Sequence, residues 1–148
     1  MTIRPATFDD VEALFEVRTS VKENHQSRAE LATIGVTPES IAGMLASSSR
    51  AWLAEEDGLP VAFAMADAGQ ATVFAMFVRP AYEGRGLGRA LMREAENWLF
   101  SEGCPEIWLL TGSEPSLRAH GFYAHLGWHR AGLEDGQIKY LKQRPDRS

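Results

Sequence analysis

Apolar residues recur along this chain with two different spacings, and the changes between them predict its elements. Alternating or continuous apolar runs predict strands, and repeats of three to four residues predict helices. The predicted strands cover residues 2–6, 50–56, 60–67, 71–78, 107–111, 128–133 and 138–142. The predicted helices start at Thr7, at Thr37 and at Gly86, and a short one covers residues 117–126. Residues 22–36 are polar and irregular, so no element is predicted there.

The clearest helical pattern covers residues 86–102. Its apolar positions fall on a single face, which consists of Leu87, Leu91, Ala95, Trp98 and Leu99. A similar stripe follows Thr7 and consists of Val11, Leu14, Phe15 and Arg18. The strand over residues 107–111 is nearly all apolar, which predicts burial on both of its faces.

The elements follow one another in the order β-α-α-β-β-β-α-β-α-β-β. Helices interspersed among strands in this way predict an α/β fold, in which a mixed sheet carries helices on both faces. A length of 148 residues suits one hydrophobic core, so residues 1–148 are predicted to form a single domain.

Composition narrows the class of protein. The chain is 45% hydrophobic and 24% charged, with a formal net charge of −5, which argues against general nucleic-acid binding. No apolar run is long enough to span a bilayer and the first residues do not form a signal peptide, so we expect a cytoplasmic protein without membrane contact. Cys104 is the single cysteine, which excludes an intrachain disulfide and a metal site built from several thiolates. No metal is expected.

The most informative segment runs from Val78 to Leu91, where a strand leads into a glycine-rich turn and then into a helix. Gly84, Gly86 and Gly88 alternate with two other residues in this turn. Glycines allow an anion to approach the backbone closely, and the first turn of a helix presents free N–H groups to it. The turn therefore predicts a site for a phosphate or pyrophosphate group.

Two common nucleotide-binding motifs do not fit this turn. A P-loop requires a lysine followed by serine or threonine, and the turn contains neither. The dinucleotide fingerprint requires a third glycine where Arg89 stands, and it follows the first strand of a βαβ unit. Here a meander of predicted strands precedes the turn, so both nucleotide interpretations fit poorly.

The stretch Glu83-Gly84-Arg85-Gly86-Leu87-Gly88 resembles the Gln/Arg-x-x-Gly-x-Gly/Ala signature of the GNAT superfamily of acetyl-CoA-dependent N-acetyltransferases. The segment Gly-Phe-Tyr-Ala-His-Leu-Gly-Trp, residues 121–128, is similar to the Phe-Tyr-x-x-Leu-Gly-Phe segment of that family. The resemblance implies a GNAT-like fold with a mixed, mostly antiparallel sheet of about six or seven strands. Two positions depart from the family: Glu83 replaces glutamine or arginine, and Ser116 stands where many members have asparagine.

The resemblance assigns the acetyl-CoA site to two segments. Backbone N–H groups of Arg85, Gly86, Leu87, Gly88 and Arg89 would bind the pyrophosphate, with positive charge from Arg85, Arg89 and, less directly, Arg79. Met76, Phe77 and Val78 would lie where the fourth and fifth strands diverge, and would bind the pantetheine arm like an added strand. The N–H near Val78 would polarise the thioester carbonyl, and Ser116 would contact the arm.

The resemblance also identifies Tyr123 as the catalytic residue, a general acid that protonates the departing thiolate. The general base stays open: Glu23 or His25 could accept the proton at the acceptor site, or ordered water could relay it. The predicted fourth strand has no carboxylate, although many family members keep a glutamate there. Three aromatic residues are candidates for the wall of the acceptor pocket: Trp52, Trp108 and Tyr82. The two tryptophans lie on predicted strands, so the alternative for them is a place in the core.

These residues predict an N-acetyltransferase that moves an acetyl group from acetyl-CoA to a primary amine by direct attack, through a tetrahedral intermediate. The acceptor would be a small-molecule or peptide amine, and a homodimer is a further expectation, since small members of the family often form one. The alternative is a non-catalytic acyl-CoA-binding sensor or interaction domain of the same fold. Glu83 and the missing strand carboxylate favour that alternative, and Tyr123 favours the enzyme.

Overall fold

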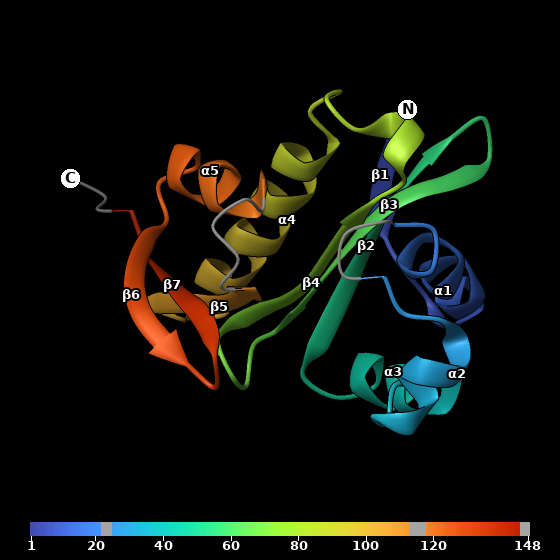
Figure 1. Cartoon of the computed structure of the whole chain (residues 1–148), viewed down its shortest axis with the longest axis horizontal. Coiled ribbons are helices and arrows are strands. Elements are labelled where there is room, and N and C mark those ends of the chain that lie inside the picture. Colours follow the sequence, from blue (N-terminus) through green and yellow to red (C-terminus); the bar gives the residue numbers. More distant parts are fainter. Residues whose placement is uncertain (22–24, 113–117, 146–148) are drawn as a thin grey trace.

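A mixed sheet in the strand order β1-β2-β3-β4-β5-β7-β6 forms the centre of the molecule (Figure 1). The computed structural model describes residues 1–21, 25–112 and 118–145. The strands are β1 (Thr2–Pro5), β2 (Ser49–Glu56), β3 (Leu59–Asp67), β4 (Thr72–Val78), β5 (Glu106–Gly112), β6 (His129–Glu134) and β7 (Gln137–Gln143). Neighbouring strands are antiparallel except β4 and β5, which are parallel. The predicted mixed, mostly antiparallel sheet is confirmed.

Helices cover both faces of this sheet, as predicted. A 3-10 turn, η1 (Phe8–Asp10), leads into α1 (Val11–Arg18), which is followed by α2 (Arg28–Thr33) and α3 (Pro38–Leu45). The other helical segments are η2 (Pro80–Tyr82), α4 (Leu87–Ser101) and α5 (Arg118–His125). Helix α1 packs on β3 and β4 and α3 on β2, whereas α4 packs on β2–β5 from the opposite face. Within the described ranges, no helix is long and apolar enough to cross a membrane.

The two faces of the sheet carry separate apolar clusters, because side chains of successive strand residues point to opposite faces. In β4, Met76 and Val78 pack against the cluster under α4, whereas Ala75 and Phe77 pack against the cluster under α1 and α3. The stripe that follows Thr7 is buried in the second cluster, with the guanidinium-bearing Arg18 at its end. Alternate residues of β4 therefore face opposite sides of the sheet.

The prediction that residues 22–36 form no element is wrong for Arg28–Thr33, which form α2. The helix starts with a capping box: Ser27 Oγ accepts from the N–H of Glu30 at 3.1 Å, and Glu30 Oε1 accepts from the N–H of Ser27 at 3.0 Å. Six residues with a single buried side chain, Leu31, give too short an apolar pattern to detect. The Ser-x-x-Glu spacing was the available signal.

The prediction that β5 is buried on both faces is also wrong. Ile107 and Leu109 are buried beneath α4, whereas Trp108 and Leu110 on the other face are only half-buried. Helices α1 and α3 cover β2–β4 and leave this part of the sheet open. The indole N–H of Trp108 instead donates to the carbonyl of Gln70 at 2.8 Å.

Candidate functional site

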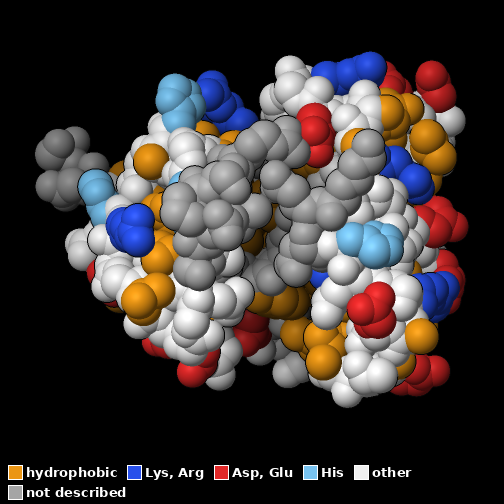
Figure 2. All heavy atoms as spheres, viewed as in Figure 1, with side chains coloured by type: hydrophobic (Ala, Val, Ile, Leu, Met, Phe, Trp, Pro, Cys, Tyr) orange, Lys and Arg blue, Asp and Glu red, His pale blue; other side chains and the backbone are white. Residues whose placement is uncertain are grey.

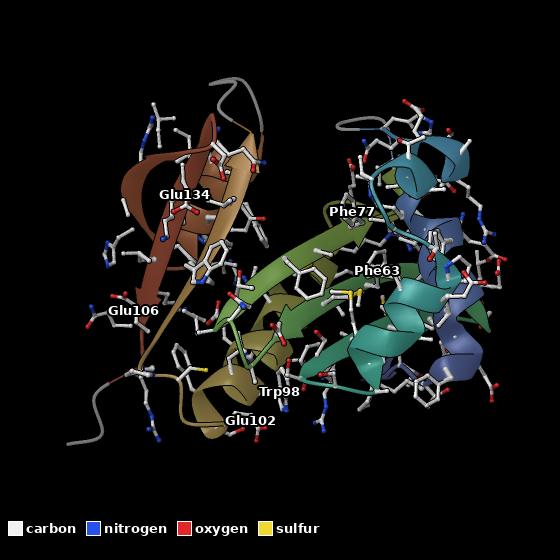
Figure 3. The ribbon with its side chains drawn as sticks, turned by 90° about the horizontal axis from the view of Figure 1, so that it is seen from below. Phe63, Phe77, Trp98, Glu102, Glu106 and Glu134 are labelled. Atoms are coloured by element: carbon white, nitrogen blue, oxygen red, sulfur yellow. The ribbon has the colours of Figure 1, made fainter. Side chains whose placement is uncertain are left out.

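The two parallel strands at the middle of the sheet separate almost as soon as they meet. Their ladder consists of one pair, Thr72 with Trp108. There the backbone N–H of Trp108 donates to the backbone carbonyl of Ala71 at 3.0 Å, and Thr72 Oγ1 donates to the backbone carbonyl of Trp108 at 2.7 Å. Beyond this point β4 pairs with β3 and β5 with β7. Figure 3 shows the two halves of the sheet diverging, and Figure 2 shows the molecular face hollowed between them, with hydrophobic side chains in the hollow.

A bulge in β4 marks the start of the open edge. Met65 of β3 pairs with Ala75 and Ala66 pairs with Val73, so Phe74 is an extra residue without a partner on β3. Its side chain is 40% exposed. Bulges bend a strand and redirect the residues that follow. The residues predicted to bind the pantetheine arm, Met76, Phe77 and Val78, follow this bulge on the edge that faces away from β3.

The glycine-rich turn opens into α4, as predicted, and the short 3-10 helix η2 separates it from β4. Gly84 and Gly86 have positive φ values of 77° and 80°, a conformation that favours glycine. Gly86 is the N-cap of α4 and, as a glycine, makes no side-chain capping hydrogen bond. The first N–H groups of an α-helix lack partners within it. The start of α4 therefore offers backbone donors, at the positive end of the helix dipole, to an anion.

Gly88 has a different role from the other two glycines. A Cβ atom placed on it would lie 3.2 Å from Cζ and 3.3 Å from Cε1 of Phe122 on α5. For Gly86, such an atom would meet nothing within 4 Å. Gly88 thus permits close packing of α4 on α5, the helix that carries Tyr123. The sequence pattern does not distinguish these two uses of glycine.

The three predicted arginines lie in different surroundings. Arg85 is exposed, with Nη1 3.4 Å from Glu56 Oε2 and Cζ 4.9 Å from the centre of the Tyr82 ring. Arg89 is exposed and lines a hollow of about 510 Å³ between α4 and the end of α5. Arg79 turns away from the glycines: its Nε donates to Pro60 O at 2.6 Å, and Nη2 lies 3.8 Å from Glu16 Oε2. Of the three, Arg79 has the weakest structural support as a pyrophosphate ligand.

Tyr123 lies half-buried on α5 among aromatic rings. Its ring centre is 5.6 Å from that of Tyr140 and 6.3 Å from that of Trp128. Burial, with a smaller contribution from Tyr140, raises the pKa of Tyr123 to about 12. The phenol therefore stays protonated at neutral pH, which is the form that a general acid requires.

A buried polar cluster, which sequence reasoning missed, holds the end of α5 in place. Glu96 on α4 accepts from the indole N–H of Trp128 at 3.0 Å and from Nζ of Lys142 at 2.7 Å. Lys142 Nζ also donates to the backbone carbonyl of Leu126 at 2.9 Å, and the backbone N–H of Trp128 donates to the backbone carbonyl of Tyr123 at 3.0 Å. Glu96 is only 8% exposed. A charged residue on the otherwise apolar face of the best predicted helix was the signal available in the sequence.

Two predicted site residues, the acceptor-site candidate Glu23 and the cofactor-binding candidate Ser116, lie outside the described residues. His25 is exposed, and its Nδ1 lies 2.9 Å from the carbonyl oxygen of Val21. A carbonyl only accepts, so Nδ1 carries the proton and Nε2 of the neutral ring keeps a lone pair. His25 thus has the tautomer that a base needs.

The aromatic candidates for the acceptor pocket differ in burial. Trp52 is 3% exposed and packs edge-on against Trp98, with ring centres 5.6 Å apart, so it belongs to the core. Trp108 and Tyr82 are half-buried. Among the described residues, no group of three or more His, Cys, Asp or Glu side chains is placed to hold a metal ion.

Comparisons with known proteins identify the family. The family model of the acetyltransferase (GNAT) family matches residues 10–128, so the chain belongs to that family. The fold is similar to that of the PaiA N-acetyltransferase from Thermoplasma acidophilum, solved in complex with coenzyme A. The two share 18% identity and a TM-score of 0.82, over 97% of this chain and 100% of that one. A comparison with curated protein sequences gives no match.

A second solved structure with this fold is the ribosomal-protein-S18-alanine N-acetyltransferase from Escherichia coli. It is 19% identical, with a TM-score of 0.71 over 95% of this chain and 90% of that one. At these identities the structural likeness concerns the fold. Family membership supports acyl transfer as the general activity.

Proposed function

We propose that this protein is an acetyl-CoA-dependent N-acetyltransferase that acetylates a primary amine by direct transfer. The observation that carries the proposal is the single-pair contact of β4 with β5, which leaves an open β4 edge between two halves of one sheet. An extended pantetheine arm can hydrogen-bond to such an edge as an added strand. The N-terminus of α4, where the N-cap residue is a glycine without a side chain, supports binding of the pyrophosphate.

In the proposed reaction, the neutral amine attacks the thioester carbonyl carbon, and the backbone N–H near Val78 stabilises the oxyanion. A C–N bond forms and the C–S bond breaks. Tyr123 gives its proton to the departing thiolate and regains one from solvent. The amine loses its proton to His25, to Glu23 or to water. Holding both substrates in one cleft supplies proximity as a source of rate enhancement.

The test is release of free thiol from acetyl-CoA in the presence of a panel of amines. Amine-dependent release, with acetylated amine found by mass spectrometry, is the expected result. Tight acetyl-CoA binding without turnover of any amine would favour the alternative, a non-catalytic sensor. Cytoplasmic location and a homodimer stay predictions, and sedimentation analysis tests the latter.

A further inference from the structure

Arg18, at the end of α1, is a buried cation without an ion pair among the described residues. It is 9% exposed. Its Nη2 donates to Gln26 Oε1 at 3.0 Å, but its Nη1 is buried and has no hydrogen-bond partner. Two other arginines on this side of the sheet are paired: Arg4 with Asp10 and Glu55, and Arg28 with Glu12. Arg18 is more deeply buried than either of them, and its Nη1 is a hydrogen-bond donor without a partner in the described part of the chain.

Such an arrangement is costly to the folded protein. A buried charge is normally paired, because desolvation without compensation is unfavourable. The same desolvation lowers the pKa of Arg18 from its usual value. The Phe77 ring, whose centre is 4.3 Å from Cζ of Arg18, compensates for part of this cost through a cation–π contact. An anion bound at Nη1 would supply the missing partner.

The position of this donor relates it to the proposed acetyl-transfer site. Phe77 follows the β4 bulge and packs with Phe63 on the face of the sheet covered by α1 and α3 (Figure 3). Its neighbour Val78 faces α4, on the same side as Tyr123. Gln26, which fixes Nη2 of Arg18, adjoins His25. The free donor thus lies beside β4, on the face of the sheet opposite Tyr123, and its neighbouring Nη2 is held by Gln26, which follows the candidate base His25 in the chain.

We propose that Nη1 of Arg18 binds a carboxylate of the acceptor, so that the acceptor is a small amine that also carries a carboxylate. This inference rests on the proposed function and specifies its second substrate. A guanidinium with one free NH₂ group, Nη1, and with its other terminal nitrogen bound to Gln26, suits a single compact carboxylate. The amine of that acceptor would lie toward Phe77 and Val78, where the thioester is proposed to bind.

The test compares L-amino acids and β-alanine with their carboxamides as acceptors, in the wild-type protein and in Arg18→Gln. The amides keep the amine and remove the negative charge. We expect the acids to be preferred in the wild type. In Arg18→Gln the KM for the acid should rise on the order of 10- to 100-fold, the value of one charged hydrogen bond. The KM values for the amide and for acetyl-CoA should not change.

Two further variants keep the result interpretable. Arg18→Lys retains the charge and should recover part of the preference. Arg28→Gln removes a surface arginine that also lies over a phenylalanine ring, Phe15, and should change neither KM.

Equal use of acids and amides by the wild type, or an equal loss for both in Arg18→Gln, would overturn the inference while leaving N-acetyl transfer intact. Phosphoethanolamine used in preference to the acids would overturn the choice of carboxylate. Failure to acetylate any amine would overturn the proposed function, and this inference with it.

Discussion

The ring edge of Phe122 lies so close to Gly88 that a Cβ on Gly88 would be 3.2 Å from Cζ of Phe122. This contact joins the helix that starts at the glycine-rich turn to the helix that carries Tyr123. The proposed pyrophosphate site and the proposed general acid are therefore coupled through helix packing, as well as through acetyl-CoA, which would contact both.

Replacing Gly88 by alanine should destabilise the protein by about 1 kcal/mol. The overlap with Phe122 costs roughly 1–3 kcal/mol, and the better helix propensity of alanine offsets less than 1 kcal/mol of it. Urea unfolding measures the difference. Gly88→Ala/Phe122→Leu should recover stability, because leucine leaves room for the new methyl group. A single Gly88→Ala variant more stable than wild type would show that propensity outweighs the contact.

Replacing Gly86 by glutamate should abolish acetyl-CoA binding, because a carboxylate would project into the proposed pyrophosphate site. Calorimetric titration with acetyl-CoA measures this. Gly136→Glu is the matched control, since Gly136 has a similar φ of 77°, open surroundings and a place in the β6–β7 turn. It carries a comparable backbone strain and should keep full affinity. Intact affinity in a folded Gly86→Glu variant would refute the placement of the pyrophosphate.

Glu96 should contribute to stability through Trp128 and Lys142. Glu96→Gln leaves the Lys142 ammonium without its carboxylate, 2.7 Å away in the wild type, and should cost roughly 2–4 kcal/mol. Chemical unfolding followed by tryptophan fluorescence measures the loss. Glu96→Gln/Lys142→Met should recover part of it, whereas Lys139→Met, at the surface pair with Glu134, should change stability by less than about 0.5 kcal/mol.

Stability should fall in acid through Asp10. The guanidinium of Arg4 donates to both of its carboxylate oxygens at 2.8 Å and lowers the pKa of Asp10 to about 2 from 3.8. The folded protein thus binds this proton less readily than the unfolded chain, so the stabilisation is complete above about pH 4 and is lost toward pH 2. With allowance for solvent screening, Asp10→Asn should cost about 1–2 kcal/mol at pH 7 and almost nothing near pH 2.

Urea unfolding at several pH values tests this dependence. Asp9→Asn, at the exposed neighbouring carboxylate, should stay within about 0.5 kcal/mol of the wild type throughout. A cost for Asp10→Asn that is the same at neutral and acid pH would contradict the role of the charge.

The elements and their order along the chain could be predicted because β2–β4 and α4 have long, clear apolar patterns that agree with their turn signals. Helix α2 could not be recognised from periodicity, since its six residues bury one leucine. The one-sided burial of β5 also escaped prediction, because it depends on where α1 and α3 end in space. The local sequence of β5 carries no information about where those helices lie.

The candidate site could likewise be predicted only in part. Gly84 and Gly86 have positive φ values, which favour glycine, so these positions can be recognised in the sequence. Arg18 follows the spacing of an apolar stripe, so the sequence shows that it faces the core. It does not show that Nη1 is left without a partner there, because that depends on side chains brought in from β4 and from the segment after α1.

The most direct test of the account is the turnover of Tyr123→Phe with the best amine of the panel, measured in single turnovers so that chemistry limits the rate. The variant removes one hydroxyl and keeps the ring that packs on Trp128 and Tyr140. The account predicts that the rate falls roughly 100-fold, as for the loss of a general acid, while the Kd for acetyl-CoA stays within about twofold. An unchanged single-turnover rate would contradict it.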